Sequence, residues 1–76
     1  MITLEQFDNL KVGDILEYKK KGRIDLDVVL EVDTDHKTML FRTIKTTHPS
    51  DDPVGLLSYR TETVRNRYTL ITSETP

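Results

Sequence analysis

The chain has 76 residues, of which 36% are hydrophobic and 32% are charged, and its formal net charge is −2. A domain of this size buries only about 60% of the surface that its unfolded chain exposes, so a deep catalytic cavity is not expected. The absence of cysteine excludes disulfides and thiolate zinc sites, and the nearly balanced charge implies neither attraction to nucleic acid nor repulsion from it.

The composition also predicts a cytoplasmic protein that does not enter a membrane. No apolar run approaches the roughly eighteen residues that a membrane span needs. The segment from Met1 to Glu5 lacks the basic start of a signal peptide. A chain without cysteine also suits a reducing compartment.

A short helix is predicted near the N-terminus. Thr3 followed by Gln6 fits a capping box, in which the threonine hydroxyl accepts a hydrogen bond from the Gln6 amide and the glutamine side chain reaches back. Ile2 and Phe7 stand at the flanking apolar positions that close such a helix start.

A strand and a basic turn follow. Gly13 favours a turn with a positive φ, and Ile15 to Tyr18 is predicted as the first strand. Four cations then surround a glycine: Lys19, Lys20, Lys21 and Arg23. This segment is either a solvated hairpin turn or a loop that binds phosphates or an acidic protein surface. Two aspartates follow at once and neutralise part of its charge.

A long β-hairpin from Ile24 to Lys45 organises the chain. Its first strand alternates apolar and acidic residues, the period of a strand with one buried face. The apolar positions, which we expect to face inward, are Ile24, Leu26, Val28, Leu30 and Val32. The polar cluster from Asp33 to His36 then turns the chain into a second β-rich run.

The register of this hairpin decides which residues face outward. A five-residue loop would push Arg42 inward, and burying an unpaired guanidinium costs several kcal/mol. A four-residue loop is therefore predicted, with Asp27 opposite Arg42 on the outside. Its inner pairs are Leu30 with Met39, Val28 with Phe41 and Leu26 with Thr43. This register leaves Val29, Leu40 and Ile44 pointing outward, to be covered by another part of the chain or by a partner.

The C-terminal half continues the β pattern. The segment 46–55 contains two prolines and a glycine and is predicted as a loop. A short strand at 56–60, a helical turn at 61–66 and a last strand at 67–72 follow, and 73–76 is predicted to be a frayed tail.

This order of elements resembles the Src-homology-3-like small β-barrels. The shared features are five short strands, a basic turn after the first strand, a tight turn in the central hairpin and one helical turn before the last strand. The segment LKVGDILEY resembles the entry into KOW-like and other translation-associated barrels. The resemblance implies a single all-β domain over 1–76, with a five-stranded barrel over 10–72 and a binding platform formed by the loops at 19–23, 33–37 and 61–66. Members that bind proline-rich peptides use a tryptophan, which this chain lacks, so no such ligand is expected.

The sequence offers no convincing catalytic or metal site. His36 stands beside two aspartates, and so does His48, but the spacing fits neither a calcium loop nor a helical zinc pair. Ser50, His48 and Asp51 are neighbours in sequence, which is not catalytic geometry. We therefore expect no metal, no cofactor and no enzyme activity.

Two functions of different classes remain. The first is a small cytoplasmic regulator or inhibitor that binds a larger protein through barrel loops and an outward apolar strip, using Val29, Leu40, Ile44, Asp35 and His36. The second is a nucleic-acid-binding or nucleoprotein-binding barrel, in which two C-terminal arginines join the lysine-rich turn. Its residues are Lys19, Lys20, Lys21, Arg23, Arg65 and Arg67.

Overall fold

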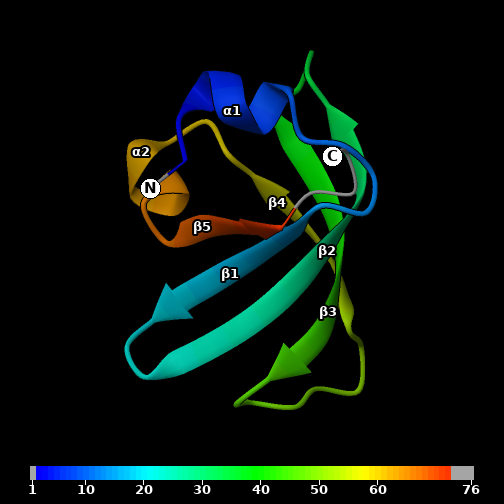
Figure 1. Cartoon of the computed structure of the whole chain (residues 1–76), viewed down its shortest axis with the longest axis vertical. Coiled ribbons are helices and arrows are strands. Elements are labelled where there is room, and N and C mark those ends of the chain that lie inside the picture. Colours follow the sequence, from blue (N-terminus) through cyan, green and yellow to red (C-terminus); the bar gives the residue numbers. More distant parts are fainter. Residues whose placement is uncertain (1, 73–76) are drawn as a thin grey trace.

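The computed structural model describes residues 2–72, except for the side chain of Thr72, and the predicted tail at 73–76 lies outside these residues. The elements are α1 (Leu4–Asp8), β1 (Ile15–Lys20), β2 (Arg23–Asp33), β3 (Thr38–Thr46), β4 (Val54–Ser58), α2 (Glu62–Arg65) and β5 (Tyr68–Thr72) (Figure 1). The strands form one antiparallel sheet in the order β4-β3-β2-β1-β5.

The predicted all-β class, with five strands and two helical turns, is confirmed. The resemblance to Src-homology-3-like barrels stays a prediction. Within the described residues, no helix has the length and apolar character needed to cross a bilayer.

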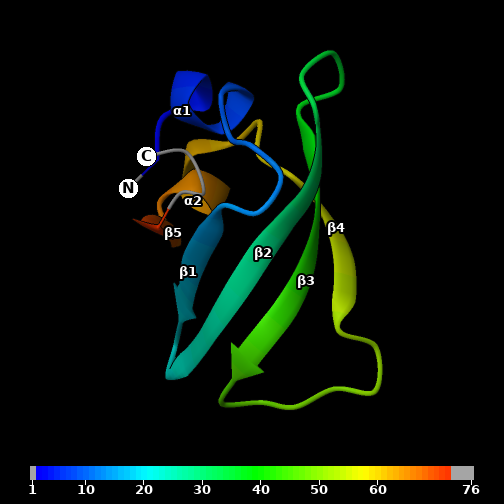
Figure 2. The same cartoon turned by 45° about the vertical axis from the view of Figure 1, so that its right-hand side comes forward.

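Both helices lie at one end of the curved sheet, whereas the β1–β2 hairpin and the β3–β4 loop lie at the other (Figures 1 and 2). The predicted capping box begins α1, since the Thr3 side chain accepts from the Gln6 amide at 3.1 Å and Gln6 accepts from the Thr3 amide at 2.8 Å. Ile2 and Phe7 are both buried. The local signals of this segment therefore define the helix.

Two tight turns set the hairpins. Lys21 and Gly22 both have positive φ, 44° and 81°, and they join the paired residues Lys20 and Arg23. Such a two-residue turn matches the twist of the flanking strands. The β2–β3 turn pairs Asp33 with Thr38, leaving a loop of four residues, as predicted, but one position further along the chain.

The predicted register of the central hairpin is wrong. Asp27 pairs with Thr43 rather than with Arg42, and Val28 pairs with Arg42. Bulges between Leu26 and Asp27 and between Val29 and Glu31 shift the ladder. A bulge adds one residue to one strand and redirects the side chains beyond it.

The burial of β2 from Ile24 to Val29 is the reverse of the prediction, whereas Val32 packs against the core, as predicted. Asp25, Asp27 and Val29 are buried on the inner face, the concave side of the sheet, whereas Ile24 is exposed and Leu26 is half-buried. Val28 and Leu30 are half-buried as well. Val29 was predicted to point outward, and its side chain is fully buried. The reason is that Val29 shares the parity of the two aspartates, which accept hydrogen bonds from Arg23, Thr46 and Thr43 inside the fold.

The hydrophobic core fills only the helix end of the inner face, which we call the closed end. Phe7 stacks on Tyr59 with ring centroids 4.7 Å apart and meets Tyr68 edge-on at 5.8 Å. Leu16, Val29 and Met39 lie in the same cluster. The core is therefore formed by α1 packing against the middle strands.

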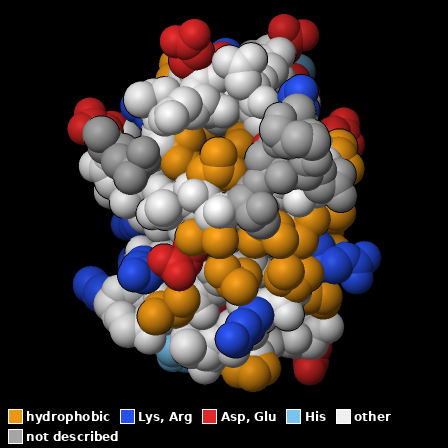
Figure 3. Space-filling view, in the orientation of Figure 1, with side chains coloured by type: hydrophobic (Ala, Val, Ile, Leu, Met, Phe, Trp, Pro, Cys, Tyr) orange, Lys and Arg blue, Asp and Glu red, His pale blue; other side chains and the backbone are white. Residues whose placement is uncertain are grey.

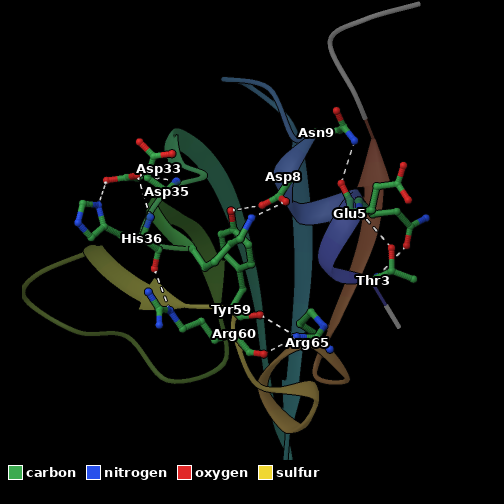
Figure 4. A network of polar contacts seen from close by, with 12 residues as sticks. Thr3, Glu5, Asp8, Asn9, Asp33, Asp35, His36, Tyr59, Arg60 and Arg65 are labelled. Carbon is green, nitrogen blue, oxygen red and sulfur yellow. Dashed lines mark hydrogen bonds and ion pairs between the residues drawn. The ribbon is translucent and has the colours of Figure 1, made fainter.

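A polar network fastens this closed end (Figure 4). The Tyr59 hydroxyl donates to Asp8 at 2.7 Å, and the Lys37 ammonium contacts the second Asp8 oxygen at 2.7 Å. These bonds lower the pKa of Asp8, with the Lys37 bond contributing most. Burial, reinforced by the Asp8 charge, raises the pKa of Tyr59. The network ties α1 to the β2–β3 turn and to the end of β4.

Candidate functional site

The outer face of the sheet carries a group of exposed and half-buried aliphatic side chains, which we call the outer apolar face. Its members are Ile24, Leu26, Val28, Leu40, Val54 and Leu56. Leu56 is 68% exposed and Ile24 42%. Hydrophobic side chains gather across the strands on this side, bordered by basic side chains (Figure 3). A gathered apolar surface of this kind is typical of an interaction site.

Two opposite charges flank the apolar stripe of β2. Glu17 and Lys45 pair with Leu26 from the neighbouring strands, one on each side. Together with Ile24, Thr46 and Thr47 they line a shallow groove of about 300 Å³. The groove therefore offers an apolar floor between an acidic and a basic edge.

The residues predicted for protein binding do not form one site. Leu40 pairs with Leu56 on the outer face, and Ile44, four residues further along β3, is 52% exposed. Asp35 and His36 lie in the β2–β3 turn, about 25 Å along β3 from Ile44 at 3.3 Å per residue. The His36 ring contacts Asp33 at 2.8 Å (Figure 4). Asp35 and His36 therefore lie far from the outer apolar face.

The predicted basic residues converge only in part. The Lys19 amide donates to the Arg67 carbonyl at 2.9 Å, which sets these two residues side by side. Lys19 contacts Glu17 at 3.3 Å and Arg23 contacts Asp25 at 2.8 Å, so each faces a carboxylate. Lys20 and Lys21 are exposed in the hairpin.

Arg65 does not join this group. Its guanidinium donates to the carbonyls of Tyr59 and Arg60, at 3.0 Å and 2.7 Å, and braces the connection between β4 and α2 (Figure 4). The basic surface is therefore smaller than the sequence predicts.

The other end of the inner face, which we call the open end, is polar. The ladder places Tyr68, Tyr18, Asp25 and Thr46 in one row across four strands. The next row contains Leu70, Leu16, Asp27 and Thr43. Asp25 is 4% exposed and Asp27 2%. Two carboxylates therefore occupy positions that aliphatic side chains hold at the closed end.

An open cleft of about 370 Å³ lies over these carboxylates, and we call it the acid cleft. Polar side chains lining it include Asp25, Asp27, Tyr18, Tyr68, Arg23 and Arg67. Leu57 and Val64 contribute apolar walls.

The two aspartates are compensated unequally. Asp25 accepts from Arg23 at 2.8 Å through one oxygen and from the Thr46 hydroxyl through the other. Asp27 accepts from the Thr43 hydroxyl at 2.7 Å through Oδ1 alone. Burial, with a smaller contribution from the Asp25 charge, raises the pKa of Asp27, and the Thr43 bond offsets only part of that rise. Asp27 therefore lacks a cationic partner of its own among the described residues.

Two tyrosines stand beside Asp27. Tyr68 is 4% exposed, and its ring lies 5.1 Å from that of Tyr18. Burial raises the pKa of Tyr68, and the Asp27 charge adds to that rise. The Tyr68 hydroxyl makes no hydrogen bond with a described residue, in contrast to that of Tyr59.

Sequence reasoning missed the acid cleft. Asp25 and Asp27 were expected outside, where they would neutralise the lysine-rich turn. The one available signal was Val29, the only apolar residue with their parity in the first strand of the hairpin. An apolar residue at that position is consistent with burial of this face instead of the opposite one.

The chain matches no family model, no curated protein and no solved structure.

Proposed function

We propose that this chain is a non-enzymatic binding module, a small cytoplasmic regulator or inhibitor that docks on a larger protein through the outer apolar face. The observation that carries the proposal is the inverted β2, which turns Ile24, Leu26 and Val28 away from the core. Full burial of an exposed aliphatic side chain contributes about 1.5 to 3 kcal/mol, and the half-buried Leu26 and Val28 would each gain less than that. A partner that covers the face recovers this free energy.

The flanking charges define the partner surface. Glu17 and Lys45 stand on opposite sides of Leu26, and Glu17 already contacts Lys19, so the matching surface has an apolar centre and an acidic group that faces Lys45. Charges placed this way fix the orientation of the complex more than they add affinity.

The test uses two variants of equally exposed apolar residues. Leu56→Asp places a charge on the outer apolar face, and Val12→Asp, at a residue 64% exposed outside the sheet, is the control. We expect Leu56→Asp to weaken partner binding by about 30-fold or more, as loss of a central apolar contact does, and Val12→Asp to leave it unchanged. Both variants should keep the fold, with unfolding free energies within about 1 kcal/mol of the parent.

The measurement is capture from a lysate of the source cells, with and without nuclease and at low and high salt. A protein that survives both treatments and is lost only with Leu56→Asp supports the proposal. Equal capture by both variants contradicts it, and light scattering of the purified chain reveals whether a second copy covers the face instead.

The nucleic-acid alternative rests on one observation, the backbone hydrogen bond from Lys19 to Arg67, which sets two basic residues side by side. It predicts that binding is lost on nuclease treatment, that it weakens steeply with salt, and that Lys20→Glu abolishes it while Leu56→Asp does not.

A further inference from the structure

The acid cleft leaves two buried polar groups without a partner. Asp27 Oδ2 accepts no hydrogen bond from a described residue, and the Tyr68 hydroxyl makes no hydrogen bond with one. Both residues are more than nine-tenths buried, and both line the cleft. Among the described residues, Asp14 Oδ1 is the only side-chain polar atom that is both sealed from solvent and without a partner. The two cleft groups are therefore accessible from solvent.

The charge of the buried Asp27 carboxylate is not compensated by a cation of its own among the described residues. Among the described residues, Arg23 is the one cation whose charge lowers the pKa of Asp27, and Arg23 is already bonded to Asp25. A buried carboxylate without a cation is costly, and the cost is relieved when a cation binds.

The arrangement selects among cations. Oδ1 of Asp27 is occupied by Thr43, so a single free oxygen remains. A guanidinium prefers two carboxylate oxygens at once, and Ca²⁺ takes six to eight oxygen ligands. An ammonium is a compact charge with three donors, which matches one carboxylate oxygen and one hydroxyl.

We propose that the acid cleft binds a protonated primary amine, whose ammonium donates to Asp27 Oδ2 and to the Tyr68 hydroxyl. The tyrosine ring is held between Phe7 and Tyr18, which fixes its hydroxyl before the ligand arrives. The alkyl chain lies against Leu57 and Val64 on the apolar wall. This site lies on the inner face of the sheet, and Leu56 of the outer apolar face also lines the cleft.

The amine can belong to a free alkylamine or to a lysine side chain, and two probes distinguish these sources. n-Butylammonium supplies the amine alone, and Nα-acetyl-lysine N-methylamide adds the flanking peptide groups. Titration of the labelled full chain, followed by NMR shifts of Asp27 and Tyr68, measures binding. We expect saturable binding of n-butylammonium with Kd on the order of 1 mM, as suits so small a ligand. Tighter binding of the lysine compound indicates a protein source, and equal binding indicates a free amine.

Three controls make the result decisive. Asp27→Asn keeps the shape of the side chain and should weaken binding about tenfold or more, whereas Asp35→Asn, at an exposed aspartate of the β2–β3 turn, should leave it unchanged. The parent chain should lose affinity as the pH falls through the pKa of Asp27, because n-butylammonium keeps its charge while Asp27 loses its own. This pH series needs no variant and stands even if Asp27→Asn unfolds.

Three outcomes overturn the proposal: no saturable shift with n-butylammonium, equal shifts with uncharged 1-butanol, or affinity independent of pH. None of these outcomes affects capture by the outer apolar face.

Discussion

The closed and open ends of the inner face share the strands β1, β2 and β3 but hold opposite chemistry. At the closed end, Phe7 and Tyr59 cover Val29 and Met39, so stability comes from apolar area. At the open end the same strands present Asp25 and Asp27, which gain little from burial and depend on hydrogen-bond partners. Apolar packing at one end of this small sheet therefore maintains the fold, while the acids at the other end add little to its stability.

Removing the Phe7 ring, which covers the core at the closed end, gives the largest expected effect. Phe7→Ala leaves a cavity among Tyr59, Tyr68 and the β2 side chains and should lower the unfolding free energy by about 3 to 5 kcal/mol. That is a large part of the 5 to 15 kcal/mol by which domains are typically stable, as a rough guide.

Thermal unfolding followed by circular dichroism measures the change. Leu4→Ala is the control, because Leu4 lies in the same helix and is 39% exposed. If Phe7→Ala costs no more than Leu4→Ala, the closed end does not carry the stability.

The boundary between the two ends gives an intermediate effect. The ring of Phe41 lies over Gly55, and a Cβ on Gly55 would stand 2.5 Å from Phe41 Cζ. Gly55→Ala should therefore force the ring aside and cost about 1 to 3 kcal/mol.

A double-mutant cycle with Phe41→Leu tests this contact by chemical unfolding. The shorter leucine relieves the clash, so the penalty of Gly55→Ala should shrink in that background. An unchanged penalty would place its cause in the backbone.

The open end gives the smallest effect, and its sign is opposite. The pKa of Asp27 is raised above the ordinary value of 3.8, so between these two pKa values the folded chain binds more protons than the unfolded chain. Stability therefore falls as the pH rises through this window. Asp27→Asn should remove that fall and make the chain more stable than the parent near neutral pH.

Asp33 provides the contrast for this measurement. Its hydrogen bond to the His36 side chain, together with bonds from backbone amides, lowers its pKa, so Asp33 stabilises the fold above the ordinary carboxyl pKa and loses that effect in acid. Asp33→Asn should thus be less stable than the parent at neutral pH. Urea unfolding from about pH 3 to pH 8 gives, for each variant, the difference in unfolding free energy from the parent. If this difference changes with pH in the same direction for both variants, the assignment of Asp27 to a buried, uncompensated position is contradicted.

Several local features were readable from the sequence. The capping box of Thr3 and Gln6, the positive φ of 96° at Gly13 and the helical turn before the last strand are all present. Each depends on residues close together in the chain, so sequence patterns capture them. The β strands follow from the same kind of signal, since alternation is a local property of an extended chain.

The face of β2 that is buried was decided by the tertiary structure alone. Alternation marks two faces but does not say which one is inside, and a bulge changes the register without a strong sequence signal. The carboxylates of Asp25 and Asp27 are tolerated inside because the hydroxyls of Thr46 and Thr43 reach them from the next strand. The sequence by itself therefore determined the elements and their turns, whereas contacts between residues distant in the chain decided that the acids face inward and the aliphatic side chains face outward.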